Sequence, residues 1–211
     1  FLDYYHEVDN QIGRILERLD DNVTIAGVSD HGFARQRMSV NLNCLLAENG
    51  FLQLKESQRP SYIDMLPETK AFAMDPGRIY LHRQGKYPGG TVTADEADLL
   101  MLELTTFFEN ATVNGQPLAS EVILGTDAYS GPFAHRAPDL IVMAAKDVAL
   151  SGRMNLTELI ESTPINGKHT YEESSFFVRG NGLGGIPADM KVENVLDVVM
   201  PRQSQRASRA A

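Results

Sequence analysis

The apolar segment of residues 23–28, VTIAGV, constrains the fold of this chain more than any other feature. It follows a run in which large apolar residues recur every three or four positions from Leu2 to Leu19, the pattern of an amphipathic helix of about 18 residues. The segment itself has no alternation of polar and apolar side chains. Such a strand is typical of a parallel sheet covered on both faces. A helix followed by a buried strand therefore predicts an α/β domain.

Further segments repeat the same alternation of helices and strands. We predict a short helix within residues 41–50, closed by Gly50, and a longer helix opened by Thr93 and Glu96, which have the spacing of a capping box. Additional strands are expected at residues 77–83, 121–124, 139–145 and 175–178. The predicted fold is α/β, with a mostly parallel sheet flanked by helices. Without a clear linker, residues 1–200 are expected to belong to one domain and residues 201–211 to form a tail.

Charge and composition exclude several classes of function. The chain has 211 residues and a net charge of −9, which argues against binding to nucleic-acid polymers or anionic membranes. No apolar run approaches the roughly 18 residues of a membrane span, and the first residues lack the features of a signal peptide. The single cysteine, Cys44, cannot form an internal disulfide. These features leave the cellular compartment and the oligomeric state open, and the missing initiator Met suggests a piece of a longer protein.

An acidic residue and a histidine stand directly after the predicted strand, in the sequence SDHGF. Ligands of open α/β sheets gather beyond the carboxyl ends of the strands, where Asp30 and His31 are expected. Gly32 permits a sharp exit of the backbone, so both side chains could reach one ion, and a carboxylate with an imidazole suits zinc. The alternative is a helix cap beside a surface histidine. Ser29 precedes the pair and is interpreted as a support for the turn.

The sequence of motifs along the chain resembles one enzyme family. The segments YYHEVDNQIGRIL, SDHGF, NLNCLLAENGFLQL, GRIYLHRQGKYPGG, YSGPFAHRAPDLIV and GKHTYEESSFFVRG occur in this order. They resemble the type I phosphodiesterase and nucleotide pyrophosphatase group of the alkaline phosphatase superfamily. The resemblance reaches to about residue 190 and is more specific than any single motif. It implies an alkaline-phosphatase-like fold, of which this chain would be the C-terminal part.

The resemblance also implies a site with two divalent metal ions, zinc or manganese. In that family the Asp-His pair binds one ion, which assigns Asp30 and His31 to it. A later histidine binds the other ion, which assigns His169, although Lys168 stands where an aspartate is usual. Of the other candidates, Asp3 and His6 are interpreted as solvated helix residues. His82 and His135 are expected to have structural roles.

The family resemblance implies hydrolysis of phosphodiester or pyrophosphate bonds in a small phosphoester or nucleotide. The family's nucleophile, a Thr or Ser, and further metal ligands lie upstream of the Asp-His pair. Only 29 residues precede Asp30 here, and they contain no such set. We therefore expect this chain alone to be inactive and to be part of a longer metal-dependent hydrolase. Two alternatives remain: a non-catalytic binding domain on the same scaffold, and a sulfatase or phosphomutase of the same superfamily.

Overall fold

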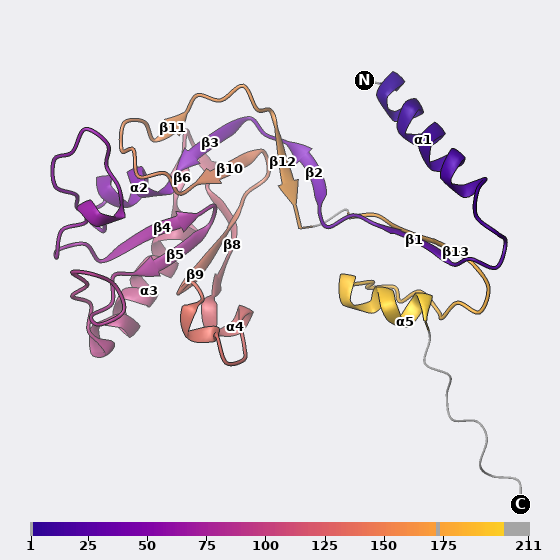
Figure 1. The fold of residues 1–211 in the computed structure, drawn as a ribbon. Helices are drawn as coiled ribbons and strands as arrows, with labels where there is room; N and C mark the ends of the chain where they lie inside the picture. The colour runs from indigo at the N-terminus through magenta and orange to yellow at the C-terminus, as the bar shows by residue number, and fades with distance from the viewer. Residues whose placement is uncertain (1, 172–173, 201–211) are drawn as a thin grey trace, which may run out of the picture. The chain divides into compact units, whose positions relative to one another are not determined.

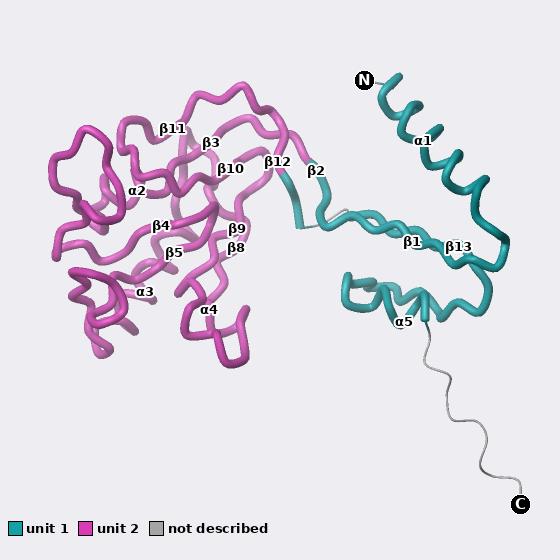
Figure 2. Tube along the Cα trace, viewed as in Figure 1, with its two compact units in different colours: residues 1–33, 169–211 teal, residues 34–168 magenta. Residues whose placement is uncertain are grey.

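The computed structural model describes residues 2–171 and 174–200, so the predicted tail at 201–211 lies outside the described residues. The chain divides into two compact units, shown in Figure 2. Unit 1 combines residues 1–33 with residues 169–211, and unit 2 contains residues 34–168.

A four-stranded antiparallel sheet is the centre of unit 2. Its order is β4 (Ala71–Asp75), β5 (Arg78–Leu81), β9 (Leu140–Ala144) and β8 (Ala119–Leu124). β4 and β5 are joined by Pro76 and Gly77 alone, and Gly77 adopts a φ of +74° that favours glycine. Such a short connection can only join antiparallel neighbours, because a parallel pair needs a crossover of a dozen residues or more.

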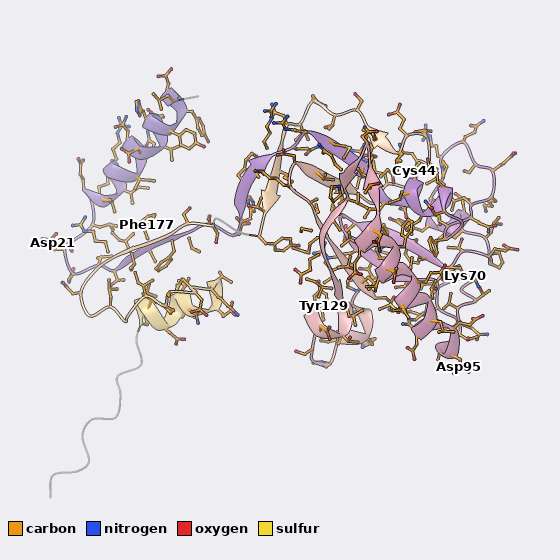
Figure 3. The ribbon with its side chains drawn as sticks, turned by 180° about the vertical axis from the view of Figure 1, so that it is seen from behind. Asp21, Cys44, Lys70, Asp95, Tyr129 and Phe177 are labelled. Carbon is orange, nitrogen blue, oxygen red and sulfur yellow. The ribbon has the colours of Figure 1, made fainter. Side chains whose placement is uncertain are left out.

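A second sheet in unit 2 contains the parallel pairing. β3 (Met38–Asn41) pairs in parallel with β10 (Val148–Ser151) and antiparallel with β11 (Ile160–Glu161). The helix α2 (Leu42–Glu48) begins directly after β3, and its N-terminus is capped by the Asn41 side chain. Figure 1 shows these elements, and Figure 3 labels Cys44 on α2.

The core of unit 2 forms between the four-stranded sheet, α2 and α3 (Ala94–Asn110), which packs against β8 and β9. Leu100, Leu104 and Phe108 of α3 are buried at spacings of four residues. They join Leu46 of α2 and Phe72 of β4 in one continuous apolar cluster. The shorter elements of unit 2 are η1 (Tyr62–Asp64), β6 (Thr112–Val113), β7 (Gln116–Pro117), α4 (Gly125–Ala128) and η2 (Ala134–Arg136).

Unit 1 contains little buried apolar surface. β1 (Ile25–Val28) pairs antiparallel with β13 (Phe176–Arg179), and α5 (Val195–Val199) lies against β1 after the short helix η3 (Val192–Asn194). α1 (Leu2–Leu16) has no buried residue. Among the described residues of unit 1, Val198 is the only buried hydrophobic one. This unit is therefore held mainly by backbone pairing.

The two segments that lead from one unit to the other are β2 (Gly32–Arg35) and β12 (Gly167–Thr170), which pair as a two-stranded sheet. The division between the units falls within both strands. No helix in the described part of the chain has the length and apolar character needed to cross a membrane.

The prediction of a mostly parallel, alkaline-phosphatase-like sheet flanked by helices is wrong. The structure is mixed α/β with small, mostly antiparallel sheets, and β1 belongs to a two-stranded antiparallel ribbon. Val28 is 51% exposed, so β1 is not covered on both faces. An apolar run predicts a strand but does not identify its partner or how many of its faces are covered.

Several element predictions are confirmed. α3 begins after Thr93 with the expected capping box, in which Thr93 and Glu96 bond reciprocally. α2 is followed by Gly50 with a φ of +80°. β5, β8, β9 and β13 each overlap a predicted strand.

Candidate metal centre

The three residues predicted to bind metal lie together in unit 1, although His31 and His169 are far apart in sequence. β1 ends at Val28, and the chain turns through Ser29 and Asp30 to His31. His169 is contributed by β12. The rings of His31 and His169 stack with their centroids 3.6 Å apart and their planes inclined by 14°. The carboxylate of Asp30 lies at the same place, 3.5 Å from Nε2 of His31.

The hydrogen bond of His31 determines which ring nitrogen is available. Nδ1 of His31 lies 2.8 Å from the carbonyl oxygen of Gly32, which can only accept, so Nδ1 carries the proton. In the neutral ring, Nε2 then presents a lone pair toward Asp30. Two electron-rich atoms that face each other in this way can be bridged by a water molecule, a proton or a metal ion. A carbonyl bonded to the far nitrogen is also the usual support of a metal-binding histidine.

The separation of these two atoms fits a single zinc ion. Zinc bonds of 2.0–2.2 Å at a tetrahedral angle place two donor atoms about 3.4 Å apart. The observed distance between Asp30 Oδ1 and His31 Nε2 is 3.5 Å. Asp30 is exposed and the side chain of His31 is one-third exposed, so the pair is open to an ion from solvent. The donor types and their spacing therefore fit a divalent metal.

The stacking of the two imidazoles excludes a single ion shared by both rings. A metal bound to imidazole lies in the ring plane, and two nearly parallel planes 3.6 Å apart do not share such a point. Pairs of catalytic metal ions lie about 3.5–4 Å apart. For both rings to be metal ligands, two neighbouring ions would therefore be needed.

The number of ligands falls short of a complete site. Within residues 2–171 and 174–200, no group of three or more His, Cys, Asp or Glu side chains is arranged to hold an ion. Structural zinc has four protein ligands and catalytic zinc three. The described residues therefore do not form a complete metal site by themselves.

Lys168, which replaces the expected aspartate, serves another purpose. Its ammonium donates to the carbonyls of Ala145 and Val148 at 2.9 and 2.7 Å. Burial lowers the pKa of Lys168, and the nearby carboxylate of Asp147 opposes that shift. The side chain ties β12 to the turn between β9 and β10 within unit 2. It does not provide a carboxylate for metal.

The contacts and positions of the other candidate residues do not indicate a role in metal binding. The His82 ring is fully buried, with its two nitrogens 3.3 and 3.0 Å from the carbonyls of Thr69 and Pro88. His135 lies on an exposed loop and bonds to the carbonyl of Pro132. Asp3 and His6 lie on exposed α1. Burial and the neighbouring Glu48 raise the pKa of the Cys44 thiol to about 11, so the thiol stays protonated at neutral pH.

Comparison with known proteins gives the family. A sequence model of the type I phosphodiesterase / nucleotide pyrophosphatase family matches residues 1–172, most of the chain. The chain therefore belongs to this family, as the order of its motifs predicted. The comparison with curated proteins gives no match.

Sequence reasoning missed two groups that support the Asp-His pair. The Gly32 carbonyl binds the His31 ring, and Ser175 is hydrogen-bonded to Ser29. The first contact depends on the backbone and has no side-chain signature. The second joins residues far apart in sequence, and only the pairing of β1 with β13 brings them together.

Proposed function

We propose that this chain forms part of a metal-dependent hydrolase that cleaves phosphodiester or pyrophosphate bonds in a small phosphoester or nucleotide. The family membership supports the reaction class. The observation that carries the metal assignment is the stack of His31 on His169 beside the Asp30 carboxylate. Asp30 and His31 would hold one ion and His169 the other, with zinc preferred for its donor set and manganese as the alternative.

The role of these residues follows from the geometry. Nδ1–H of His31 is held by the Gly32 carbonyl, so Nε2 stays directed toward the metal side. Asp30 contributes negative charge to the same point and favours binding of a dication. When bound, a pair of divalent ions stabilises the attacking and leaving oxygens of an in-line displacement at phosphorus.

The nucleophile would come from an N-terminal segment of a longer polypeptide. Of the hydroxyl residues before Asp30, tyrosines aside, Thr24 precedes β1 at its far end. Ser29 is already bonded to Ser175, with its oxygen 2.6 Å from that amide. Neither is free to attack a substrate at the Asp30 site. We expect the remaining metal ligands to come from the same upstream segment.

A chromogenic phosphodiester assay with added zinc or manganese tests the proposal. The present chain should give no turnover, whereas a longer parent with the upstream segment should be active. In the parent, His31→Ala should lower turnover by at least about a hundredfold, because a metal ligand is lost. His135→Ala is the matched control, since this exposed histidine bonds only to a nearby loop carbonyl. Undiminished activity in the His31→Ala parent would refute the metal role.

A non-catalytic binding domain is the second candidate. It is favoured by the absence of a complete metal-ligand group among the residues that the structure describes. The two candidates differ in the parent protein: a binding domain would give no turnover at any metal concentration. Robust turnover by the present chain would contradict both, because it would require a nucleophile within this sequence.

A further inference from the structure

The first hydrogen bonds beyond the end of the β1–β13 ribbon differ from those of a regular ladder. The register pairs Val28 with Phe176, so Ser29 and Ser175 occupy the next position. The amide of Ser29 donates to the carbonyl of Ser175 at 2.9 Å, as a regular antiparallel ladder requires. The reciprocal bond in such a ladder would run from the Ser175 amide to the Ser29 carbonyl. Instead, the Ser175 amide donates to the side-chain oxygen of Ser29 at 2.6 Å.

The use of a side-chain oxygen in place of the Ser29 carbonyl changes the path that the backbone can take after Ser29. With the Ser29 hydroxyl as the acceptor, the backbone of Ser29 no longer has to keep the direction of the strand. The chain can leave the ribbon at this residue while the ribbon end stays closed. Asp30 and His31 follow immediately, and in a continuing strand their side chains would point to opposite faces. In the structure, their side chains meet at 3.5 Å.

The same pair of bonds also fixes the residue from which the chain enters β13. Ser175 begins the return of the chain into β13 and lies shortly after His169. Through its amide and its carbonyl, Ser175 is fixed to Ser29. Ser29 therefore lies two residues before His31 and is bonded to Ser175, which follows His169 in the chain. The rings of these two histidines stack with their centroids 3.6 Å apart.

We propose that Ser29 is a positioning residue, whose hydroxyl closes the β1–β13 ribbon and thereby sets Asp30 and His31 against His169. The importance of this role for metal binding rests on the proposed function. The bond between Ser29 and Ser175 and the stacked rings are present without a metal ion. Ser29 does not contact the metal or the substrate. Its effect passes through the two histidine rings.

The roles of the two serines are unequal, and this gives a matched control. The short bond uses the side chain of Ser29 but only the backbone of Ser175. The Ser175 hydroxyl lies 3.4 Å from that of Ser29, a long contact between exposed groups. Ser29→Ala should therefore break the closure, whereas Ser175→Ala should keep it. Ser29→Thr retains a hydroxyl at the same carbon and should restore the wild-type behaviour.

The first measurement is made on the metal-free chain by NMR. In Ser29→Ala, the Ser175 amide should lose protection from hydrogen exchange, and the ring signals of both His31 and His169 should shift. Ser175→Ala and Ser29→Thr should keep the ring signals of the wild type. Unchanged ring signals in Ser29→Ala would overturn the inference, whether or not the protein binds metal. A general loss of the fold in Ser29→Ala would also overturn it, because the effect is expected to be local.

The second measurement is the affinity for Zn²⁺ alone, by competition with a chromogenic chelator. Ser29→Ala should bind about tenfold more weakly than the wild type, the loss typical of residues that orient a metal ligand. The unchanged Asp30 and His31 side chains should leave some binding. Wild-type affinity in Ser29→Ala, together with lost affinity in His31→Ala, would refute the inference and leave the proposed function standing. No difference between the wild type and His31→Ala would refute the proposed function, and the NMR result would still decide the role of Ser29.

Discussion

At the scale of single residues, buried amides and carboxylates connect parts of unit 2 that are distant in sequence. Asn43 is fully buried on α2 and reaches both β4 and the segment after β10. Its side-chain oxygen accepts from the amide of Ala73 at 2.7 Å, and its nitrogen donates to the carbonyls of Ala73 and Gly152 at 2.8 and 2.9 Å. One side-chain amide thus bonds to three backbone groups on two different segments.

Asn43→Ala should lower the free energy of unfolding by about 3 kcal/mol, because the buried Ala73 amide loses its acceptor and two carbonyls keep only their bonds from the Tyr62 hydroxyl. Asn49→Ala is the control: Asn49 donates to the carbonyl of Leu45 at the exposed end of α2. Its loss should cost no more than about 1 kcal/mol. Urea unfolding of the two variants measures the difference. Equal effects would contradict the bridging role of Asn43.

Asp64 gives unit 2 a stability that depends on pH. Hydrogen bonds from Lys55 and then from Ser61 lower the pKa of the Asp64 carboxyl, and burial only partly opposes them. A carboxyl with a lowered pKa stabilises the fold above its unfolded value, near pH 4, and loses this contribution as the pH falls through the folded value. Asp64→Asn should therefore destabilise the protein at pH 7.

The destabilisation caused by Asp64→Asn should shrink as the medium is acidified below pH 4. Thermal unfolding of both proteins between pH 7 and pH 3 measures this change. Glu68→Gln, at an exposed position in the same region, should show no such trend. A wild-type advantage that stayed constant down to pH 3 would show that Asp64 acts through packing alone.

At the scale of elements, the sequence predicted what each segment forms better than which partner it takes. The Thr93–Glu96 box and the amphipathic pattern after it identified α3, because capping and helical periodicity are local. The direction of β1 depends on β13, far away in sequence, and no local pattern specifies that partner. The site shows the same division. Asp30 and His31 are a local motif, whereas their closeness to His169 depends on the pairing of distant segments.

Alanine substitutions at two glycines should have opposite effects on stability, because one glycine is crowded by backbone atoms and the other is not. A Cβ on Gly125, the first residue of α4, would lie 1.9 Å from the carbonyl oxygen of Pro138. A Cβ on Gly13 of α1 would meet no atom within 4 Å. Gly125→Ala should lower the free energy of unfolding by at least about 2 kcal/mol, as overpacking against backbone does.

Gly13→Ala, in contrast, should raise helicity and stabilise α1 by up to about 1 kcal/mol. Circular dichroism and thermal unfolding of the two variants measure both effects. A Gly125→Ala protein as stable as the wild type would show that α4 can move away from Pro138 without cost.

At the scale of the whole molecule, the two units differ in how much apolar surface they bury. The continuous apolar core belongs to unit 2, whereas α1 exposes its apolar stripe to solvent. Leu2 of that stripe is 67% exposed and Ile15 is 59% exposed. Apolar burial is the main source of stability, so the resistance to unfolding should be unequal between the units.

Hydrogen exchange of the intact chain should show this inequality. Amides of β4, β5, β8 and β9 should exchange only through global unfolding of unit 2. Amides of α1 should exchange at least about a hundredfold faster, because helices without tertiary packing open locally. Mass spectrometry of peptic fragments measures both. Equal protection of α1 and β5 would mean that the apolar stripe of α1 is covered in solution.

The pairing of β2 with β12 means that unit 2 begins and ends at neighbouring points. Near these ends, the amide of Gln36 donates to the carbonyl of Asn166 at 2.7 Å. A module whose two ends touch can be inserted into a host chain, or removed from it, with little disturbance to either part. Unit 2 has this form, because its residues form one continuous segment between β1 and β13 in the sequence. In evolution, such a module can change in size and surface, while the bond between Ser29 and Ser175 keeps His31 beside His169.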